Sequence, residues 1–351
     1  MPRLRFAPSA CPDTAADRLD RIIVPQLNPE RFDAAIRRLR RRFAVYAETC
    51  PVPLPASGLI VTSEIRRQSE VYLPIDEISN AFNQLYRAAL THPPLLTSTP
   101  FDTTLSWADA HSRFPRRLRC SADPSRLLEA LLDDRDLLVR FLLASFLPER
   151  FYGGFRRYPE QLGWARNWMT SRARAHCRCL DAACGTGEGT WDLAGLLREC
   201  GWAPDACSVE GWTIEPLEVW AAAHGSFPHD HSREEHYRQE TGDLLASGWG
   251  DAILFVCVDT ASPLPRTCHF DLITCNGLLG GPILHQPAAL RTVVGNLSGL
   301  LAAGGVLLSA DRFHEGWKRK CPQDELRALF EACGMETFRA GEGIGGLKLH
   351  Q

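Results

Sequence analysis

The sequence has no long apolar run: no stretch approaches the 18 or more uncharged apolar residues of a membrane span. Its first twenty residues also lack the continuous apolar core of a secretory signal. Net charge is nearly absent, because 39 basic residues stand against 42 acidic ones and leave −3. Nucleic-acid-binding proteins usually carry an excess of positive charge, so this balance argues against a nucleic-acid partner. We therefore expect a cytoplasmic chain with no membrane association.

An even set of cysteines, as a disulfide framework would need, is also missing. The 13 cysteines are odd in number and scattered along the chain. Cys177 and Cys179 are separated by one residue, which is not a standard zinc spacing. We expect free thiols in a reducing compartment and no metal site.

The first 155 residues are expected to form a mainly helical N-terminal domain that selects a substrate or contacts a partner. Asn28-Pro29 is a typical helix start, and an apolar stripe follows it at helical spacing. The opposite face of this helix carries five arginines between Arg37 and Arg42. That face is either simply solvated or a docking surface for an acidic protein partner.

Residues 156–351 change in character, because short apolar runs now alternate with helical patterns. This alternation predicts an α/β fold with a parallel sheet covered on both faces. The last two of seven expected strands are joined by a short turn, so the final strand must be antiparallel. The expected fold is a Rossmann-like, seven-stranded, mostly parallel sheet with an antiparallel last strand, preceded by the helical domain.

A glycine-rich turn lies where the first expected strand, 179–183, meets its helix. It reads Asp-Ala-Ala-Cys-Gly-Thr-Gly-Glu-Gly-Thr over residues 181–190. A phosphate-binding loop would need a Lys-Ser/Thr pair, which is missing. A dinucleotide turn would need a third glycine where Thr190 stands, and Glu188 would repel the pyrophosphate. S-adenosyl-L-methionine has no phosphate and carries two cationic groups, so it suits an acidic turn, and an NAD-dependent dehydrogenase is the weaker alternative.

The same turn resembles motif I of class I S-adenosylmethionine-dependent methyltransferases. More narrowly, residues 183–188 are similar to the C-S-T-G-E-E turn of the chemotaxis-receptor (CheR-type) group. The resemblance spans about residues 160–351 and implies S-adenosyl-L-methionine as cofactor. The turn residues that it assigns to the cofactor are Asp181, Ala183, Cys184, Gly185, Thr186, Gly187, Glu188 and Thr190.

Later positions follow the family pattern with departures. The family's ribose-binding acid aligns with Thr213, so Glu215, two residues on, is our first candidate for that contact and Thr213 the second. Asp259 matches the acid that reaches the adenine amino group, although it is also a typical turn residue. Asn276 and Gly277 stand where the CheR-type pattern has Arg and Asn, and are expected to line the methionine part of the cofactor.

Candidates for the acceptor side lie in two segments. Residues 224–236 hold four histidines, from which we select His229 and His231 as catalytic candidates; a surface insertion or, less readily, a metal site are the alternatives. The aromatic segment before the second domain contributes Tyr158 as a third candidate. In CheR-type enzymes the corresponding segment reaches the cofactor carboxylate, a role that Arg157, or else Arg156, would take here.

These residues predict direct in-line methyl transfer from S-adenosyl-L-methionine to a small-molecule or peptide acceptor. Such a reaction depends chiefly on alignment in a dry pocket, so a missing catalytic triad does not argue against it. The absence of a [DN]PP[YF] tetrad weakens amino-group methylation of DNA bases or glutamine. The alternatives are a glutamate O-methyltransferase of a chemotaxis-type receptor and a non-catalytic protein that keeps the cofactor fold.

Overall fold

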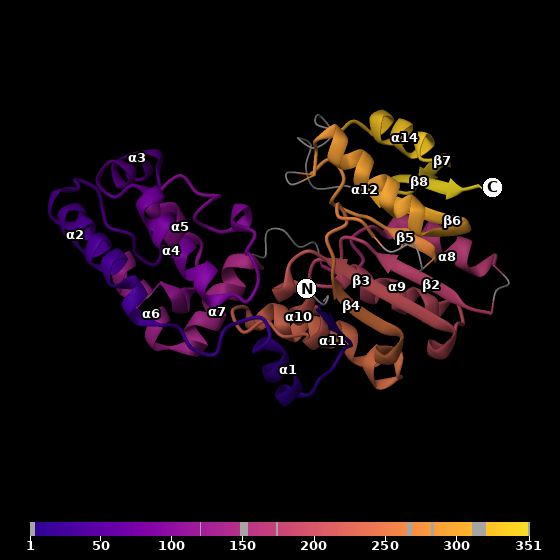
Figure 1. Ribbon diagram of the computed structural model, residues 1–351, viewed down its shortest axis with the longest axis horizontal. Helices are drawn as coiled ribbons and strands as arrows, with labels where there is room; N and C mark the ends of the chain where they lie inside the picture. The colour runs from indigo at the N-terminus through magenta and orange to yellow at the C-terminus, as the bar shows by residue number, and fades with distance from the viewer. Residues whose placement is uncertain are drawn as a thin grey trace. The chain divides into compact units, whose positions relative to one another are not determined.

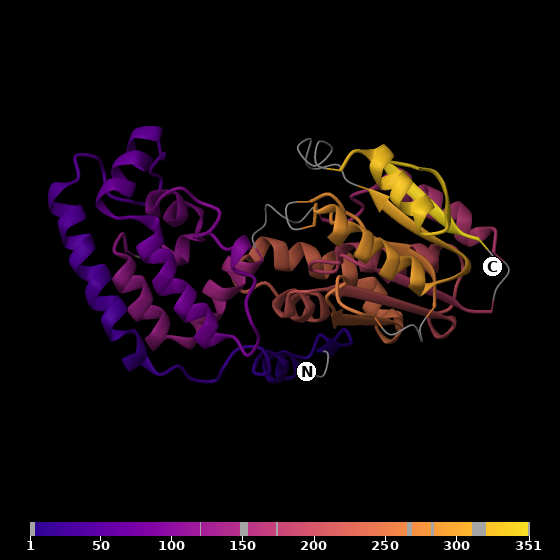
Figure 2. The ribbon, with the colours of Figure 1, turned by 45° about the horizontal axis from the view of Figure 1, so that its top comes forward.

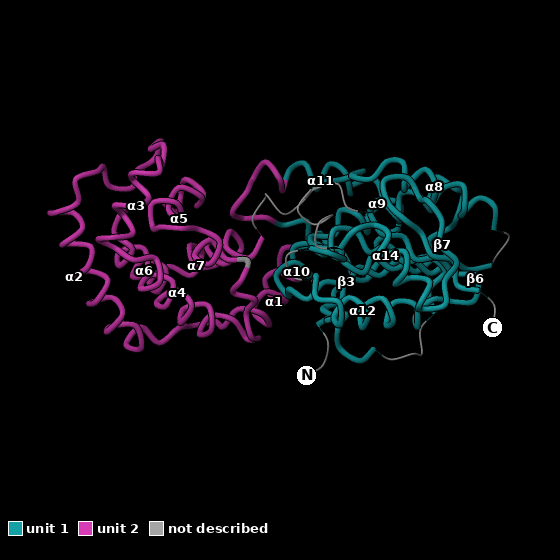
Figure 3. Tube along the Cα trace, turned by 90° about the horizontal axis from the view of Figure 1, so that it is seen from above, with its two compact units in different colours: residues 1–11, 152–226, 235–351 teal, residues 12–151, 227–234 magenta. Residues whose placement is uncertain are grey.

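The computed structural model describes residues 4–119, 121–147, 154–172, 175–264, 269–281, 284–310 and 321–349. The chain divides into two compact units, coloured separately in Figure 3. The first contains residues 1–11, 152–226 and 235–351, and the second contains residues 12–151 and 227–234. The helical unit is therefore assembled from two separate stretches of chain.

The first unit is built on one eight-stranded sheet in the order β1-β4-β3-β2-β5-β6-β8-β7. Its central strands β2 to β6 run parallel, and β8 pairs antiparallel with both β6 and β7. This confirms the expected α/β fold with its antiparallel last strand. The strands are β1 (Arg5–Phe6), β2 (Cys177–Asp181), β3 (Cys207–Thr213), β4 (Ile253–Cys257), β5 (Phe270–Thr274), β6 (Leu301–Ala310), β7 (Met335–Ala340) and β8 (Gly343–Lys348).

Two strands differ from the sequence-based prediction. β1 adds an eighth strand, because a short N-terminal segment pairs antiparallel with the outer edge of β4. β6 begins at Leu301, whereas apolar periodicity alone extends the preceding helix to this residue. Gly304, with φ of 70°, and a register shift against β5 accommodate this early start. A strand of two residues carries no periodic pattern, which is why β1 could not be predicted.

Helices cover both faces of this sheet, and α9 and α12 lie on opposite sides of the strands in Figure 3. One face packs α12 and α14 against a large apolar cluster that includes Leu180, Ile273 and Leu307 (Figure 1). On the other face, the rings of Trp191 and Phe255 are 6.4 Å apart between centroids. The helices are α8 (Pro159–Thr170), α9 (Glu188–Glu199), α10 (Pro216–His224), α11 (His231–Ala246), α12 (Pro287–Leu300) and α14 (Gln323–Ala332).

Because β3 and β5 flank β2 on opposite sides, the chain order reverses at β2. Loops after β2 and β5 lead to opposite faces of the sheet, which opens the carboxyl edge at this point. In doubly wound sheets, ligands bind at this reversal. The glycine-rich turn follows β2 directly, so the fold places it at the expected ligand edge.

The second unit is helical, as expected for this part of the chain (Figure 2). Its core is rich in aromatic rings: Phe82 and Phe101 stack at 4.5 Å, and Tyr86 stacks on Phe141 at 5.6 Å. None of the helices in the described parts of the chain is long and apolar enough to cross a membrane. Its α-helices are α1 (Pro12–Leu19), α2 (Asp33–Thr49), α3 (Ser63–Tyr72), α4 (Ile75–Ala89), α5 (Trp107–Arg113), α6 (Pro124–Asp133) and α7 (Arg135–Phe146).

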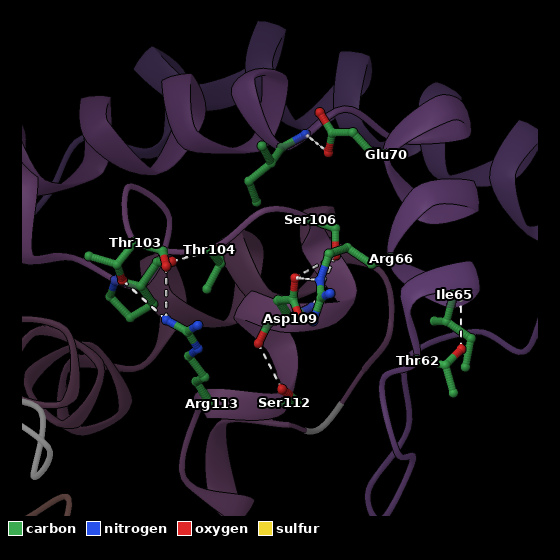
Figure 4. A network of polar contacts seen from close by, with 12 residues as sticks. Thr62, Ile65, Arg66, Glu70, Thr103, Thr104, Ser106, Asp109, Ser112 and Arg113 are labelled. Carbon is green, nitrogen blue, oxygen red and sulfur yellow. Dashed lines mark hydrogen bonds and ion pairs between the residues drawn. The ribbon is translucent and has the colours of Figure 1, made fainter.

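A polar network fastens α3 to α5 inside this unit (Figure 4). Arg66 donates from Nε and Nη2 to the two carboxylate oxygens of Asp109, at 2.6 and 3.0 Å. Ser106 caps α5 by accepting the backbone N–H of Asp109 at 3.3 Å. Burial acts to raise the pKa of Asp109, but the bonds and charge of Arg66 outweigh it, so the pKa lies below its ordinary value.

Candidate functional site

The glycine-rich turn has a conformation that only glycine adopts without strain. Gly185 and Gly187 have φ of 52° and 93°, and the N–H of Gly187 donates to the carbonyl of Cys184 at 2.8 Å. A Cβ atom on Gly187 would lie 2.8 Å from both Ala222 Cβ and Phe255 Cε1. The turn therefore needs glycine here for backbone conformation and for packing.

Two acidic side chains flank the turn. Glu188, the first residue of α9, is buried and accepts two bonds from Thr186 Oγ1, at 2.9 and 2.7 Å. Asp181, at the end of β2, is buried and accepts a bond from Thr190 Oγ1 at 3.1 Å. Negative charge at a helix N-terminus is favourable in itself, but the same charges would repel a phosphate ligand. The turn is thus built for a ligand that is not strongly anionic.

Asp181 is held in a confined space. Burial raises its pKa to about 6, while bonds from Thr190 and Thr274 and from the backbone act in the opposite direction. A Cβ atom on Gly189 would lie 2.8 Å from Asp181 Oδ2, so glycine keeps this space free. A carboxylate whose charge is disfavoured by burial gains most from a cationic ligand, because the cation offsets the lost solvation.

Beyond the end of β3, two glutamates have different surroundings. Glu215 is buried and is the N-cap of α10, where its Oε1 accepts the N–H of Leu217 at 3.2 Å. Glu218, in the first turn of the same helix, accepts a hydrogen bond from the hydroxyl of Thr213. Sequence reasoning missed Glu218, because it lies five residues beyond the strand end and falls outside the aligned motif. The only sequence signal was a second acid in the first turn of a helix at the ligand edge.

Asp259 follows β4 at an exposed position. Its Oδ1 accepts the N–H of Ala261 at 2.9 Å, and its Oδ2 accepts the hydroxyl of Ser262 at 2.7 Å. These bonds are those of a turn-forming aspartate. Each carboxylate oxygen has a second lone pair, so the adenine contact stays a prediction.

Asn276 and Gly277 follow β5. Asn276 and Gln161 of α8 exchange two amide hydrogen bonds, at 2.8 and 3.1 Å, and Asn276 Oδ1 also accepts the N–H of Ala310 at 2.8 Å. This side chain therefore joins three segments of the unit. Gly277 has φ of 69°, and a Cβ atom there would have no heavy atom within 4 Å. Open space beside Gly277 is compatible with its expected place against the cofactor.

The segment before α8 contains the two candidate arginines. The guanidinium of Arg156 forms two bonds with the carboxylate of Glu240, at 2.8 and 2.6 Å, so it is engaged within this unit. Arg157 is half-buried and lies 5.7 Å from the centroid of the buried Tyr158 ring. Arg157 therefore remains the candidate for the cofactor carboxylate.

The histidine-rich segment is largely part of the helical unit. Residues 227–234 group with that unit, and α11 begins at His231, where the sequence suggested a loop. His229 Nε2 lies 3.3 Å from the carbonyl oxygen of Leu147. Burial lowers the pKa of His229 to about 4, so its ring is neutral at pH 7. His231 is exposed.

The sequence-predicted residues thus fall into two groups. The carboxyl edge of the sheet brings together the candidates that follow β2, β3, β4 and β5, with Arg157 and Tyr158 in the same unit. His229 and His231 belong to the other unit. Residues that could hold a cofactor are therefore concentrated in one unit, as doubly wound folds require.

No family model matches this sequence, and no curated protein does so. Similar solved structures include a TehB-like S-adenosylmethionine-dependent methyltransferase from Corynebacterium glutamicum, at 15% identity, covering 54% of this chain and 85% of that chain with a TM-score of 0.34. CalS10, an amino pentose methyltransferase from Micromonospora echinaspora solved with bound S-adenosylmethionine, has 16% identity, covers 54% of this chain and 91% of that chain, and has a TM-score of 0.36.

The antibiotic-resistance methyltransferase Kmr has 15% identity, covers 53% of this chain and 91% of that chain, and has a TM-score of 0.34. All three of these proteins are methyltransferases. At this distance they are a likeness of fold, and the argument for function rests on the site itself.

Proposed function

We propose that this protein is an S-adenosyl-L-methionine-dependent methyltransferase. One observation carries the proposal: the glycine turn at the reversal of strand order is flanked by two buried carboxylates, Asp181 and Glu188. Phosphate ligands are disfavoured by these charges, whereas a ligand with an ammonium and a sulfonium group is favoured. The raised pKa of Asp181 fits such a ligand, because a nearby cation restores the charged form.

The cofactor supplies an activated methyl group on sulfur. The residues of this chain would hold and orient it: the turn around Gly185 and Gly187 lets the backbone approach closely, and Arg157 is the candidate for its carboxylate. Alignment of an acceptor with the methyl group then provides much of the rate. Tyr158, His229 and His231 remain the candidates for contacts with the acceptor. His229 is neutral at pH 7, and its lowered pKa makes it a weak base there, so a contact role fits it better than proton transfer.

Calorimetry with S-adenosylhomocysteine tests the proposal. We expect binding by the wild-type chain, no binding by a Gly187→Val variant, and no binding of NAD. Failure of the wild type to bind at millimolar ligand would overturn the proposal. Transfer of radiolabelled methyl to small molecules, and to peptides that include glutamate-containing receptor peptides, then tests the acceptor class. A base-labile product on glutamate would favour the receptor-type reaction, whereas tight binding without transfer to any acceptor would favour a non-catalytic role.

We also propose that the exposed face of α2 binds an acidic protein segment. Arg40 pairs with Glu129 and Arg42 with Glu77, while no bond from Arg38 or Arg41 is found among the described residues. Both of these arginines lie along one face of α2 together with Arg37, Arg42, Ala34 and Val45. Arginine side chains form planar pairs with carboxylates, so this face suits an acidic segment. Val45 on the same face is 53% exposed, so a helical segment that also carries apolar residues fits it best.

A double substitution, Arg38→Glu with Arg41→Glu, tests this surface. We expect it to abolish binding of a fluorescent Glu/Leu-rich helical peptide, while melting temperature and S-adenosylhomocysteine affinity stay unchanged. Arg31→Glu, at an exposed arginine that precedes α2, is the matched control. Equal binding by the double variant would contradict the proposal, and preferential binding of RNA by the wild type would favour a nucleic-acid surface instead.

A further inference from the structure

We infer that Glu218 is the carboxylate that recognises the ribose of the bound nucleoside, from the first turn of α10 and in place of an acid at the end of β3. This inference rests on the proposed function and deepens it. In doubly wound folds, an acid at the end of the second strand binds ribose hydroxyls. Here that strand is β3, and it ends in Thr213, whose side chain cannot supply the negative charge.

The hydrogen bond from Thr213 Oγ1 to Glu218 connects the two positions directly. It brings a carboxylate from α10 back to the strand end. Glu218 is half-buried, so it is accessible to a ligand, whereas Thr213 is 8% exposed. Thr213 thus serves to orient the carboxylate, and Glu218 serves to bind.

Charge effects on two cysteines agree with this placement. Burial raises the pKa of Cys257, the last residue of β4, to about 11, and the charges of Glu215 and Glu218 act in the same direction. Burial also raises the pKa of Cys184 in the glycine turn, with Asp181, Glu218 and Glu188 contributing. Glu218 is thus one of the acids whose charge acts on both cysteines.

Glu215, the other acid of this loop, is committed to a structural bond. Its Oε1 accepts the N–H of Leu217 at the N-terminus of α10, and its side chain is buried. A half-buried carboxylate is reached by sugar hydroxyls more readily than a buried one whose oxygen caps a helix. The structure therefore favours Glu218 over Glu215 for the ribose contact.

An exposed apolar residue directly precedes Glu215 in the same loop. Ile214 is 44% exposed, directly after the last residue of β3. An apolar side chain left open next to a carboxylate suits a nucleoside, because the flat base covers apolar surface while the sugar donates hydrogen bonds. We assign Ile214 to the base and Glu218 to the ribose.

The experiment compares two ligands by calorimetry with the full-length chain: S-adenosylhomocysteine and its 2′,3′-dideoxy analogue, which lacks both ribose hydroxyls. Hydrogen bonds from the ribose hydroxyls to a charged carboxylate should make the wild type bind the natural ligand about 10- to 100-fold more tightly than the analogue. In Glu218→Gln this preference should fall at least about tenfold, because the neutral amide has the same size and still accepts the bond from Thr213.

Glu215→Gln is the matched control and should keep the wild-type preference. Ile214→Ser should lower the affinity for S-adenosylhomocysteine and for its dideoxy analogue equally, so that the preference for the natural ligand is unchanged. The dideoxy analogue reports folding, since a misfolded variant loses both ligands. No binding by the wild type would overturn the proposed function. Wild-type binding with an unchanged preference in Glu218→Gln would overturn only the present inference, and loss of preference in Glu215→Gln alone would assign the ribose to Glu215.

Discussion

Gly187 shows how one residue serves both conformation and packing. With φ of 93° and a virtual Cβ 2.8 Å from two neighbours, it has no room for any side chain. We expect Gly187→Ala to lower the free energy of unfolding by about 2–4 kcal/mol, from backbone strain plus overpacking. Binding of S-adenosylhomocysteine should weaken strongly at the same time.

Gly195 provides the matched control for this prediction. It lies inside α9, and a Cβ atom there would meet Leu244 Cδ1 at 3.8 Å, an ordinary contact. Gly195→Ala should therefore stabilise the protein by about 0.5–1 kcal/mol and leave ligand affinity unchanged. Thermal unfolding and calorimetry measure both effects, and equal behaviour of the two variants would contradict our account of the turn.

The raised pKa of Asp181 implies that ligand binding depends on pH. Its pKa in the folded protein is raised to about 6, so the stability that it contributes is present below its ordinary pKa and lost as pH rises through 6. The ionised form attracts the ammonium group of S-adenosylhomocysteine, so affinity for this ligand should increase about tenfold between pH 5 and pH 7.

Two variants isolate this effect. Asp181→Asn should bind more weakly and show a flat profile between pH 5 and pH 7. Asp192, whose pKa burial raises to about 7, also titrates near this range, so Asp192→Asn is the control and should keep the slope. A slope that persists in Asp181→Asn would show that another group controls binding.

At the scale of elements, the contact between α3 and α5 depends on Arg66 and Asp109. Asp109→Asn should lower the free energy of unfolding at pH 7 by about 1–2 kcal/mol, a modest value because Arg66 is partly exposed to solvent. The folded-state pKa of Asp109 lies below its ordinary value, so its contribution is present above about pH 4 and is lost as pH falls through the folded-state pKa.

Unfolding curves between pH 7 and pH 2.5 check the sign of this effect. The difference between wild type and Asp109→Asn should shrink as pH falls. Glu64→Gln, on the same helix as Arg66 but in an exposed pair with Arg67, is the control and should change stability by far less. A difference independent of pH would mean that packing, not charge, holds these helices together.

Elements with a regular apolar pattern could be predicted from the sequence, and those without one could not. The strand–helix alternation after residue 156 predicted the sheet and its antiparallel end, because burial on both faces produces continuous apolar runs. α11 was missed, because its buried residues are only Tyr237, Thr241 and Leu244 in an otherwise polar helix. Glu218 was missed for a related reason: its place depends on a contact between a strand end and a helix turn, which no local pattern encodes.

At the scale of the whole molecule, the chain enters the helical unit twice. It first builds residues 12–151 and later returns for residues 227–234. In this second passage, Arg140 Nη1 of α7 donates to the carbonyl of Pro228 at 2.8 Å. Phe227 is fully buried, and the guanidinium of Arg233 lies 4.4 Å from the centre of its ring. A segment between α10 and α11 therefore stabilises the helical unit, although it lies far along the chain from most of that unit.

This interleaving predicts where a core substitution will act. Phe227→Ala should lower the free energy of unfolding by about 3–5 kcal/mol, as for other buried phenylalanines. We expect the helical unit to be the part that is destabilised. Hydrogen exchange should accelerate in α7, near Leu142 and Leu143, while amides of β2 and β5 keep their protection. Leu105→Ala, at a position 71% exposed in the same unit, should leave both patterns unchanged. Faster exchange in β2 and β5 instead would show that residues 227–234 stabilise the sheet, and that the histidine-rich segment belongs energetically to the unit that contains the sheet.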